Sequence, residues 1–215
     1  MDTIHYIALS MGTAWASGIN LYAAVFMLGY LGSTGNVALP PELMLVTDPL
    51  VMTAAGLMYC VEFFADKTPG VDTVWDSVHT FIRIPLGAVL AMSAVGDTTP
   101  AVELAAFLVG GSLTAATHAT KAGGRVIINS SPEPVSNWFT SLGEDFLVIT
   151  GMWAAVTHPW IFVVFLIFFI ILMIWLLPKI WRGIKLIFSK LRNFFNGNRN
   201  VTVPTLESSS ESRNE

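Results

Sequence analysis

Eighteen consecutive apolar residues, 160–177, constrain this chain more than any other feature: WIFVVFLIFFIILMIWLL. A helix that crosses the hydrocarbon core of a bilayer needs about 20 such residues. Charged residues make up only 12% of the 215 residues, about half of the fraction usual in soluble domains. Several further apolar segments precede it in the same short chain. The sequence therefore predicts an all-α integral membrane protein rather than a soluble domain with one buried helix.

Short segments rich in turn residues divide the chain into six predicted spans, at 5–31, 48–66, 74–95, 100–122, 137–157 and 159–177. Lys and Arg gather in the cytoplasmic segments of membrane proteins, and seven of the eleven in this chain follow Pro178. We therefore expect the C-terminus in the cytoplasm, and six crossings place the N-terminus there too. The first residues, MDTIHYIALS, lack the cationic region and cleavage site of a signal peptide.

The chain changes character after Pro178. Residues 179–195 place apolar side chains at helical spacing with Lys and Arg between them, a pattern typical of an amphipathic helix in the membrane interface. Such a helix favours anionic lipids as partners, although a plain stop-transfer anchor explains the pattern equally well. Residues 196–215 are polar and predicted to be disordered. The predicted organisation is thus a membrane domain at 1–178, an interfacial helix at 179–195 and a cytoplasmic tail.

The few charges within the predicted spans fall on single helical faces. Asp72, Asp76, His79 and Arg83 are spaced i, i+4, i+7 and i+11, which is one side of a helix. An ionisable group inside a bilayer costs about 2.5–3.5 kcal/mol, so we expect these side chains to line a polar cavity inside the bundle. The residues assigned to that cavity are Asn20, Glu62, Asp66, Lys67, Asp72, Asp76, His79, Arg83, His118, Lys121, Arg125, Asn129, Asn137, Glu144 and Asp145.

Two turns share a spacing of six residues from Pro to Trp, in PGVDTVW at 69–75 and PEPVSNW at 132–138. Two acids, Glu62 and Asp66, precede the first Pro, and two cations, Lys121 and Arg125, precede the second. Two basic residues, His79 and Arg83, follow the first Trp, and two acids, Glu144 and Asp145, follow the second. A two-fold pairing of the hairpins would set acid opposite base in both places. The repeat is parallel for six simple crossings and inverted if a hairpin is re-entrant, which the sequence leaves open.

These segments resemble a bacterial membrane family catalogued as domain of unknown function 4126. The similarity rests on SGIN at 17–20, VEFFADKTPGVDTVWDSVHTFIR at 61–83, HATKAGGRVIINSSPEPVSNW at 118–138 and GEDF at 143–146. It extends over roughly residues 10–158, so the last span, the basic helix and the tail look specific to this chain. The resemblance implies a multi-pass fold in the inner membrane of a bacterium and brings no established activity.

Three interpretations of the polar cavity follow. The first is a small transporter or channel for an ion or a small polar or anionic solute. Asp76 and His79 would couple it to protons, because carboxylates and imidazoles can titrate near neutrality in such a site, and in a related form it would handle lipid phosphates. The second is an intramembrane metal-dependent enzyme, although HExxH, GxSxG and phosphate-loop motifs are absent. The third is a structural salt-bridge network.

We favour the transporter or channel. No cofactor and no nucleic-acid partner is expected, and the sequence leaves open whether a metal binds. A bundle of only six spans is compatible with a homodimer, but no sustained face of small residues predicts one.

Overall fold

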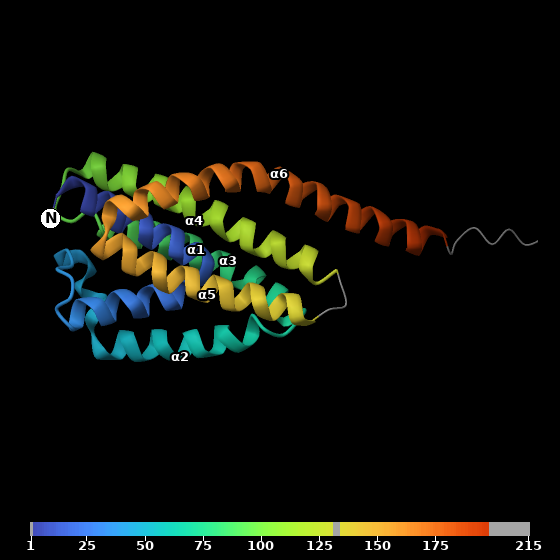
Figure 1. Ribbon diagram of the computed structural model, residues 1–215, viewed down its shortest axis with the longest axis horizontal. Helices are drawn as coiled ribbons and strands as arrows, with labels where there is room; N and C mark the ends of the chain where they lie inside the picture. Colours follow the sequence, from blue (N-terminus) through green and yellow to red (C-terminus); the bar gives the residue numbers. More distant parts are fainter. Residues whose placement is uncertain (1, 131–133, 198–215) are drawn as a thin grey trace, which may run out of the picture.

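The computed structural model describes residues 2–130 and 134–197, and every regular element in them is a helix (Figure 1). The elements in chain order are α1 (Thr3–Ser33), the short 3-10 helix η1 (Pro41–Thr47), α2 (Pro49–Ala65), α3 (Val71–Ser93), α4 (Pro100–Ile128), α5 (Pro134–Thr157) and α6 (Pro159–Gly197). The all-helical prediction is confirmed. Almost all of the predicted disordered tail, and Pro132 of the second Pro-to-Trp turn, lie outside the described residues.

The helices begin at sequence signals that suit a helix N-terminus. Proline occupies the first turn of α2 and α4, where its missing N–H removes no helical hydrogen bond. Asp48 caps α2 by accepting a hydrogen bond from the backbone N–H of Leu50 at 2.8 Å. Gly70 precedes α3 with φ 86°, a conformation that glycine adopts without strain. Only residues 66–70 connect α2 to α3.

Helix α1 forms the centre of the bundle, and it contacts all the other elements (Figure 1). Its Trp15 is fully buried and meets Phe162, Phe165 and Phe169 of α6 edge to face, with ring centroids 5.3–5.9 Å apart. Aromatic pairs in this geometry stabilise a fold beyond the area that they bury. The apolar core of the protein is therefore centred on the first half of α1.

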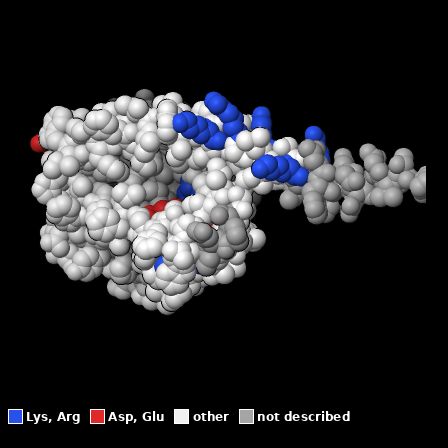
Figure 2. All heavy atoms as spheres, turned by 45° about the vertical axis from the view of Figure 1, so that its right-hand side comes forward, with Lys and Arg blue, Asp and Glu red and all other residues white. Residues whose placement is uncertain are grey.

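The polarity of the bundle is the reverse of that of a soluble protein. Its outer surface carries large apolar side chains, among them Phe64, Phe81, Phe139, Phe146 and Phe168, each more than 60% exposed. Soluble monomers rarely expose so much contiguous apolar surface. Figure 2 shows a largely uncharged face, with Lys and Arg gathered on the projecting part of α6. The charges of the remaining helices are mostly buried between them.

Three helices are long and apolar enough to cross a membrane: α1, α4 and the part Pro159–Lys190 of α6. The elements η1 and α2 make a fourth candidate if they form one span, bent by 63°. Helices α3 and α5 have 23 and 24 residues but are less uniformly apolar, because they carry several of the buried charges. Six crossings therefore stay a prediction.

Helix α6 differs from the prediction at Pro178. We expected a span that ends there and a separate helix at 179–195, but one helix runs through Pro178 to Gly197. An internal proline removes a helical hydrogen bond and usually kinks a helix. Helix α4 supports α6 just beyond this point, because Gly123 lies so close to Ile180 that a Cβ there would be 2.4 Å from its Cγ2. The end of α6 then projects from the bundle (Figure 1).

Gly18 provides a test of the close contact between α1 and α4. A Cβ at this position would lie 2.7 Å from the backbone O of Thr114 and from Cβ of Thr117, and the backbone of a packed helix cannot move aside as a flexible side chain can. We expect Gly18→Ala to destabilise the protein by about 1–3 kcal/mol, measured as a lower midpoint of thermal unfolding in detergent. Gly143→Ala is the control, because no heavy atom lies within 4 Å of the added Cβ. A Gly18→Ala protein as stable as the control would contradict the packing.

Candidate functional site

Helix α1 is broken in its middle at Asn20, which has the extended angles φ −147° and ψ 97°. Asn20 caps the second half of the helix, since its Oδ1 accepts a hydrogen bond from the N–H of Ala23 at 2.9 Å. In an unbroken helix that N–H would bond to the carbonyl of Ile19. Two cations take its place: Lys121 Nζ lies 2.9 Å and Arg83 Nη1 3.1 Å from the Ile19 oxygen. The break thus creates a polar point at the centre of the bundle.

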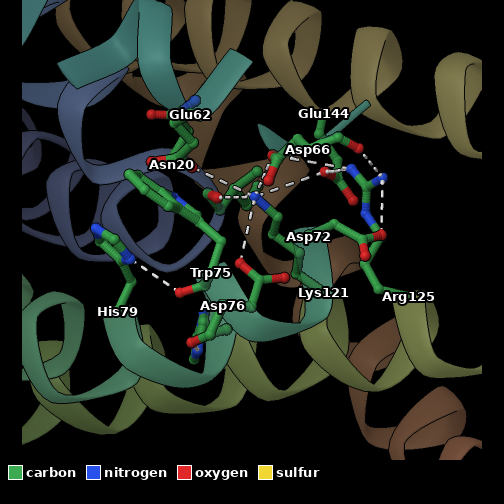
Figure 3. A network of polar contacts seen from close by, with 12 residues as sticks. Asn20, Glu62, Asp66, Asp72, Trp75, Asp76, His79, Lys121, Arg125 and Glu144 are labelled. Atoms are coloured by element: carbon green, nitrogen blue, oxygen red, sulfur yellow. Dashed lines mark hydrogen bonds and ion pairs between the residues drawn. The ribbon is translucent and has the colours of Figure 1, made fainter. Parts of the chain in front are cut away.

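The ammonium of Lys121, on α4, lies among oxygen atoms from four other helices (Figure 3). The Ile19 carbonyl of α1 is one of them. The distances from Nζ to the others are 2.6 Å for Asp66 Oδ2, 3.4 Å for Glu62 Oε1, 3.7 Å for Asp76 Oδ1 and 3.8 Å for Glu144 Oε2. Only 2% of the lysine side chain is exposed. A buried ammonium needs such partners, because burial of an unpaired charge is very costly.

Arg83, on α3, is fully buried and pairs with two acids. Its Nη2 lies 2.5 Å from Glu62 Oε1 on α2, and its Nη1 lies 3.2 Å from Asp76 Oδ1, which is on α3 itself. The same Nη1 approaches His118 Nδ1 at 3.4 Å. Because a guanidinium can only donate, Nδ1 of His118 is the acceptor and the imidazole carries its proton on Nε2. That nitrogen lies 3.2 Å from the backbone carbonyl of Asp76 and 2.8 Å from the hydroxyl of Thr80. His118 is therefore neutral in this arrangement.

Arg125, one turn further along α4, connects the network to α5. Its Nη2 lies 2.5 Å from Glu144 Oε2. Its Nη1 donates to the backbone carbonyl of Asp66 at 2.9 Å and to the side-chain oxygen of Asn137. These contacts join the C-terminal end of α2 to α4 and α5 around one guanidinium.

Asp72 closes the network at the start of α3. Both of its carboxylate oxygens accept hydrogen bonds from Asn129 Nδ2, at 2.8 and 2.9 Å. Its Oδ1 also accepts the backbone N–H groups of Gly70 and Thr73, at 2.9 and 2.6 Å. The N-terminus of a helix favours a negative charge, so Asp72 is stabilised where it lies.

Lys67 lies in the turn between α2 and α3 and reaches α5. Its Nζ lies 3.1 Å from Ser141 Oγ, 3.2 Å from the carbonyl of Phe63 and 3.6 Å from Asp145 Oδ2. It also lies 3.0 Å from the centroid of the Phe63 ring, a favourable cation–π position. The other oxygen of Asp145 accepts from Asn20 Nδ2 at 3.3 Å. Asp145 therefore connects Lys67 to the helix break.

His79 lies beside the ionic contacts rather than among them. Its Nδ1–H donates to the carbonyl of Trp75 at 2.9 Å, and its ring stacks on the Trp75 indole with centroids 4.1 Å apart. Its Nε2 lies 3.2 Å from the hydroxyl of Tyr22. Tyr22 in turn lines an apolar pocket of about 470 Å³ between α1, η1, α2 and α3. His79 thus contacts a residue that lines this pocket.

The network is reached from one end of the bundle. Figure 2 shows a hollow in this face, with atoms of acidic and basic residues on its floor. A pocket of about 180 Å³ also borders the network, and its lining includes Lys121, Arg125 and Glu144. The side chain of Glu144 is 16% exposed, more than that of any other acid in the ion pairs. Glu144 therefore lies at the open edge of the network.

The structure places every residue assigned to the polar interior in this network or directly beside it. The predicted opposition of the α2 acids and the α4 cations is confirmed by the contact between Asp66 and Lys121. The predicted opposition of Arg83 to Glu144 or Asp145 is wrong, because Glu62 and Asp76 neutralise the guanidinium. The two-fold repeat is therefore not confirmed at these charges.

Sequence reasoning missed three contributors: the Ile19 carbonyl, the Tyr22 hydroxyl and the Thr80 hydroxyl. The signal that could have found the carbonyl lies in SGIN at 17–20, because glycine weakens a helix interior and asparagine favours a helix cap. Tyr22 and Thr80 have no sequence signal of their own, because each contacts a histidine on another helix: Tyr22 of α1 contacts His79 of α3, and Thr80 of α3 contacts His118 of α4.

The acids are not arranged as metal ligands. Across residues 2–130 and 134–197, no three His, Cys, Asp or Glu side chains form a group that could hold a metal ion. Cations or N–H donors contact the carboxylates instead. The geometry of the network therefore does not favour the metal-dependent enzyme.

The pair formed by Glu62 and Arg83 tests the energetics of the network. Glu62→Gln and Arg83→Met should each destabilise the protein by about 3–5 kcal/mol, because each leaves a buried charge without its partner. The double variant should lose less than the sum of the single losses, as interacting residues do. Thermal unfolding in detergent measures these losses, with Glu42→Gln as an exposed control. Strictly additive losses would show that the two side chains do not depend on each other.

Comparison with known proteins identifies the family to which this arrangement belongs. A family model described as "Domain of unknown function (DUF4126)" matches residues 7–179. No curated protein and no solved structure matches the chain. The match covers nearly all of α1, then η1 and α2–α5, and the first half of α6, and therefore the whole charged network. The resemblance predicted from the sequence is thereby confirmed, but the match continues past residue 158 through 159–179, so the expectation that the last span is specific to this chain is wrong. The chain belongs to the DUF4126 family.

Proposed function

We propose that this protein is a small transporter or channel of the bacterial inner membrane, which moves an ion or a small polar solute and is coupled to protons. The observation that carries the proposal is the break of α1 at Asn20. This break releases the Ile19 carbonyl from the helix, and the carbonyl accepts hydrogen bonds from Lys121 and Arg83 inside a buried network of ion pairs. Membrane transporters commonly bind ions at discontinuous helices, where unwound backbone carbonyls and charged side chains meet near the middle of the bilayer.

The dimensions and surface of the bundle support six crossings. At 1.5 Å per residue, α3 and α5 are about 35 Å long, enough for a hydrocarbon core of about 30 Å. The exposed phenylalanines of α2, α3, α5 and α6 suit contact with lipid. In that setting the charges of α3 and α5 have to face the bundle interior, because they would be unstable against lipid. We place both termini in the cytoplasm, since the basic part of α6 follows the last span.

Cysteine labelling tests this topology. Cys60 is the single cysteine of the chain, so Cys60→Ala provides a background without thiols. In it, Asp97→Cys reports the turn between α3 and α4, and Thr68→Cys reports the turn between α2 and α3; both positions are exposed. A membrane-impermeant maleimide should label intact spheroplasts only in the Asp97→Cys variant, and both variants after permeabilisation. Labelling of Thr68→Cys from outside would overturn the orientation.

We propose anionic lipids as partners of the projecting part of α6. Arg182, Lys185 and Lys190 are exposed there, beside the exposed Trp181 and Phe188. Basic residues next to apolar ones just beyond a membrane span favour the negative surface of the cytoplasmic leaflet.

Flux in proteoliposomes tests the proposed activity. A gradient of each ion of a panel would be imposed across the proteoliposome membrane, and a pH-sensitive dye would report proton movement. The wild type would be compared with Asp76→Asn, His79→Ala and Arg125→Ala. Each variant removes one polar group of the network, so we expect flux to fall by about tenfold or more, which corresponds to about 1.4 kcal/mol in the barrier. Glu42→Gln, exposed and outside the network, is the matched control.

The same assay separates transport from the alternatives. No flux under any gradient, together with variants that are merely less stable, would favour a structural salt-bridge network. Lipid-phosphate handling has less support, because Lys67, Arg83, Lys121 and Arg125 each already contact an acid.

A further inference from the structure

An apolar pocket of about 470 Å³ lies between α1, η1, α2 and α3, at the end of the bundle opposite to the projecting part of α6 (Figure 1). Its lining is apolar except for Tyr22, Glu42 and Ser93, and it includes Leu50 and Met58 of α2. Ligand pockets in proteins usually have about 300–1,000 Å³ and mostly apolar walls with a few polar groups. The pocket therefore has the size and the lining of a binding site for an apolar ligand.

The pocket opens where α2 and α3 separate from each other. Residues 66–70 join the two helices directly, yet α2 and α3 contact each other far less than α3 and α4 do. Leu50 of α2 and Leu86 of α3 line the pocket, and they are 78% and 45% exposed. The opening therefore lies on the apolar outer surface of the bundle, which faces hydrocarbon when the bundle spans a membrane.

The depth of the pocket matches one leaflet of a bilayer. The pocket begins at η1 and the first residues of α2, at one end of the bundle, and it reaches Tyr22 and Met58 in the interior. From Leu50 to Met58, α2 rises by about 12 Å at 1.5 Å per residue. Half of a hydrocarbon core of about 30 Å is about 15 Å. A lipid chain that enters from the near leaflet is therefore long enough to reach the inner end of the pocket.

The chemistry of the lining selects an uncharged occupant. In the part of the chain that the structure describes, no Lys, Arg or His borders the pocket. A phosphate would lack a cation to pair with there, and an unpaired charge is unstable in apolar surroundings. Apolar cavities also stay dry and take up apolar molecules. The acyl chains of lipids are the apolar molecules that surround a protein at this depth of a membrane, so a chain rather than a head group fits the pocket.

We propose that this pocket holds one acyl chain of a bilayer phospholipid, with the head group at the end of the bundle and the end of the chain beside Tyr22 and Met58. The chain would pack against Tyr22, whose hydroxyl lies 3.2 Å from His79 Nε2. The bound lipid would thus support a residue that contacts the edge of the polar network. Placement of the pocket in the outer leaflet rests on the proposed topology, whereas binding of the chain does not.

Photochemical cross-linking tests the proposal in the full chain. The protein would be reconstituted in vesicles of phosphatidylethanolamine and phosphatidylglycerol that contain a phosphatidylethanolamine with a diazirine near the end of one acyl chain. After illumination and digestion, mass spectrometry would locate the lipid adducts. We expect the adducts to concentrate on the lining, at Met58 and Leu86. Phe146 and Phe168 provide the comparison, because they are exposed near the middle of α5 and α6 and lie outside this pocket.

Ala54→Phe tests whether the pocket itself binds the chain. Ala54 lines the pocket and is exposed, so a phenylalanine there takes up space that the chain would occupy. We expect this variant to lose the adducts at Met58. Ala119→Phe is the matched control, because it makes the same change at an exposed position of α4 that does not line the pocket. The control should keep the adducts at Met58.

Three results would overturn the proposal. The first is an even distribution of adducts over the lining and the exposed phenylalanines, since lipid would then merely cover the surface; this result decides even if Ala54→Phe does not fold. The second is a folded Ala54→Phe protein with unchanged adducts at Met58. The third is a lining without adducts, together with cross-linking of two copies by a bismaleimide through Cys60, the single cysteine of the chain and exposed on α2. A second copy would then occupy the pocket in place of lipid.

Discussion

The carbonyl of Ile19 organises the polar half of this bundle. Asn20 takes the N–H that the carbonyl would otherwise bond within α1, and Lys121 and Arg83 bind the freed oxygen. These two cations come from α4 and α3, so the break brings both helices to the centre of the molecule. Each cation then requires acids, which α2, α3 and α5 supply. A single disturbed turn in the central helix therefore determines where four other helices place their charges.

The charge positions were largely predictable, because helical periodicity places side chains without knowledge of the partners. Asp72, Asp76 and Arg83 share a face by spacing alone, and in the structure they are buried. The opposition of Asp66 to Lys121 followed from the opposed signs around the two Pro-to-Trp turns. These predictions held because an unpaired charge has few stable positions in an apolar bundle.

The features that sequence reasoning missed depend on contacts in three dimensions. The partner of Arg83 is set by the approach of α2 to α3, not by any repeat, so Glu62 binds it in place of Glu144 or Asp145. The residues of SGIN weaken a helix, but they do not reveal that Asn20 caps the second half of α1 and frees the Ile19 carbonyl. Helix α6 passes through Pro178, and α4 packs against it just beyond this point through Gly123. Pro85 likewise lies inside α3, so a proline in this sequence does not by itself mark the end of a helix.

The ion pairs join helices that are far apart in the chain, and this has a consequence for how the protein is made. The partners Glu62 and Arg83 are 21 residues apart, and Asp66 and Lys121 are 55 residues apart. If α2, α3 and α4 cross a bilayer as proposed, Glu62 meets its cation only once Arg83 of α3 has been made, and Asp66 only once Lys121 of α4 has been made. We therefore expect these three helices to leave the insertion machinery together rather than one at a time, with their charges already paired.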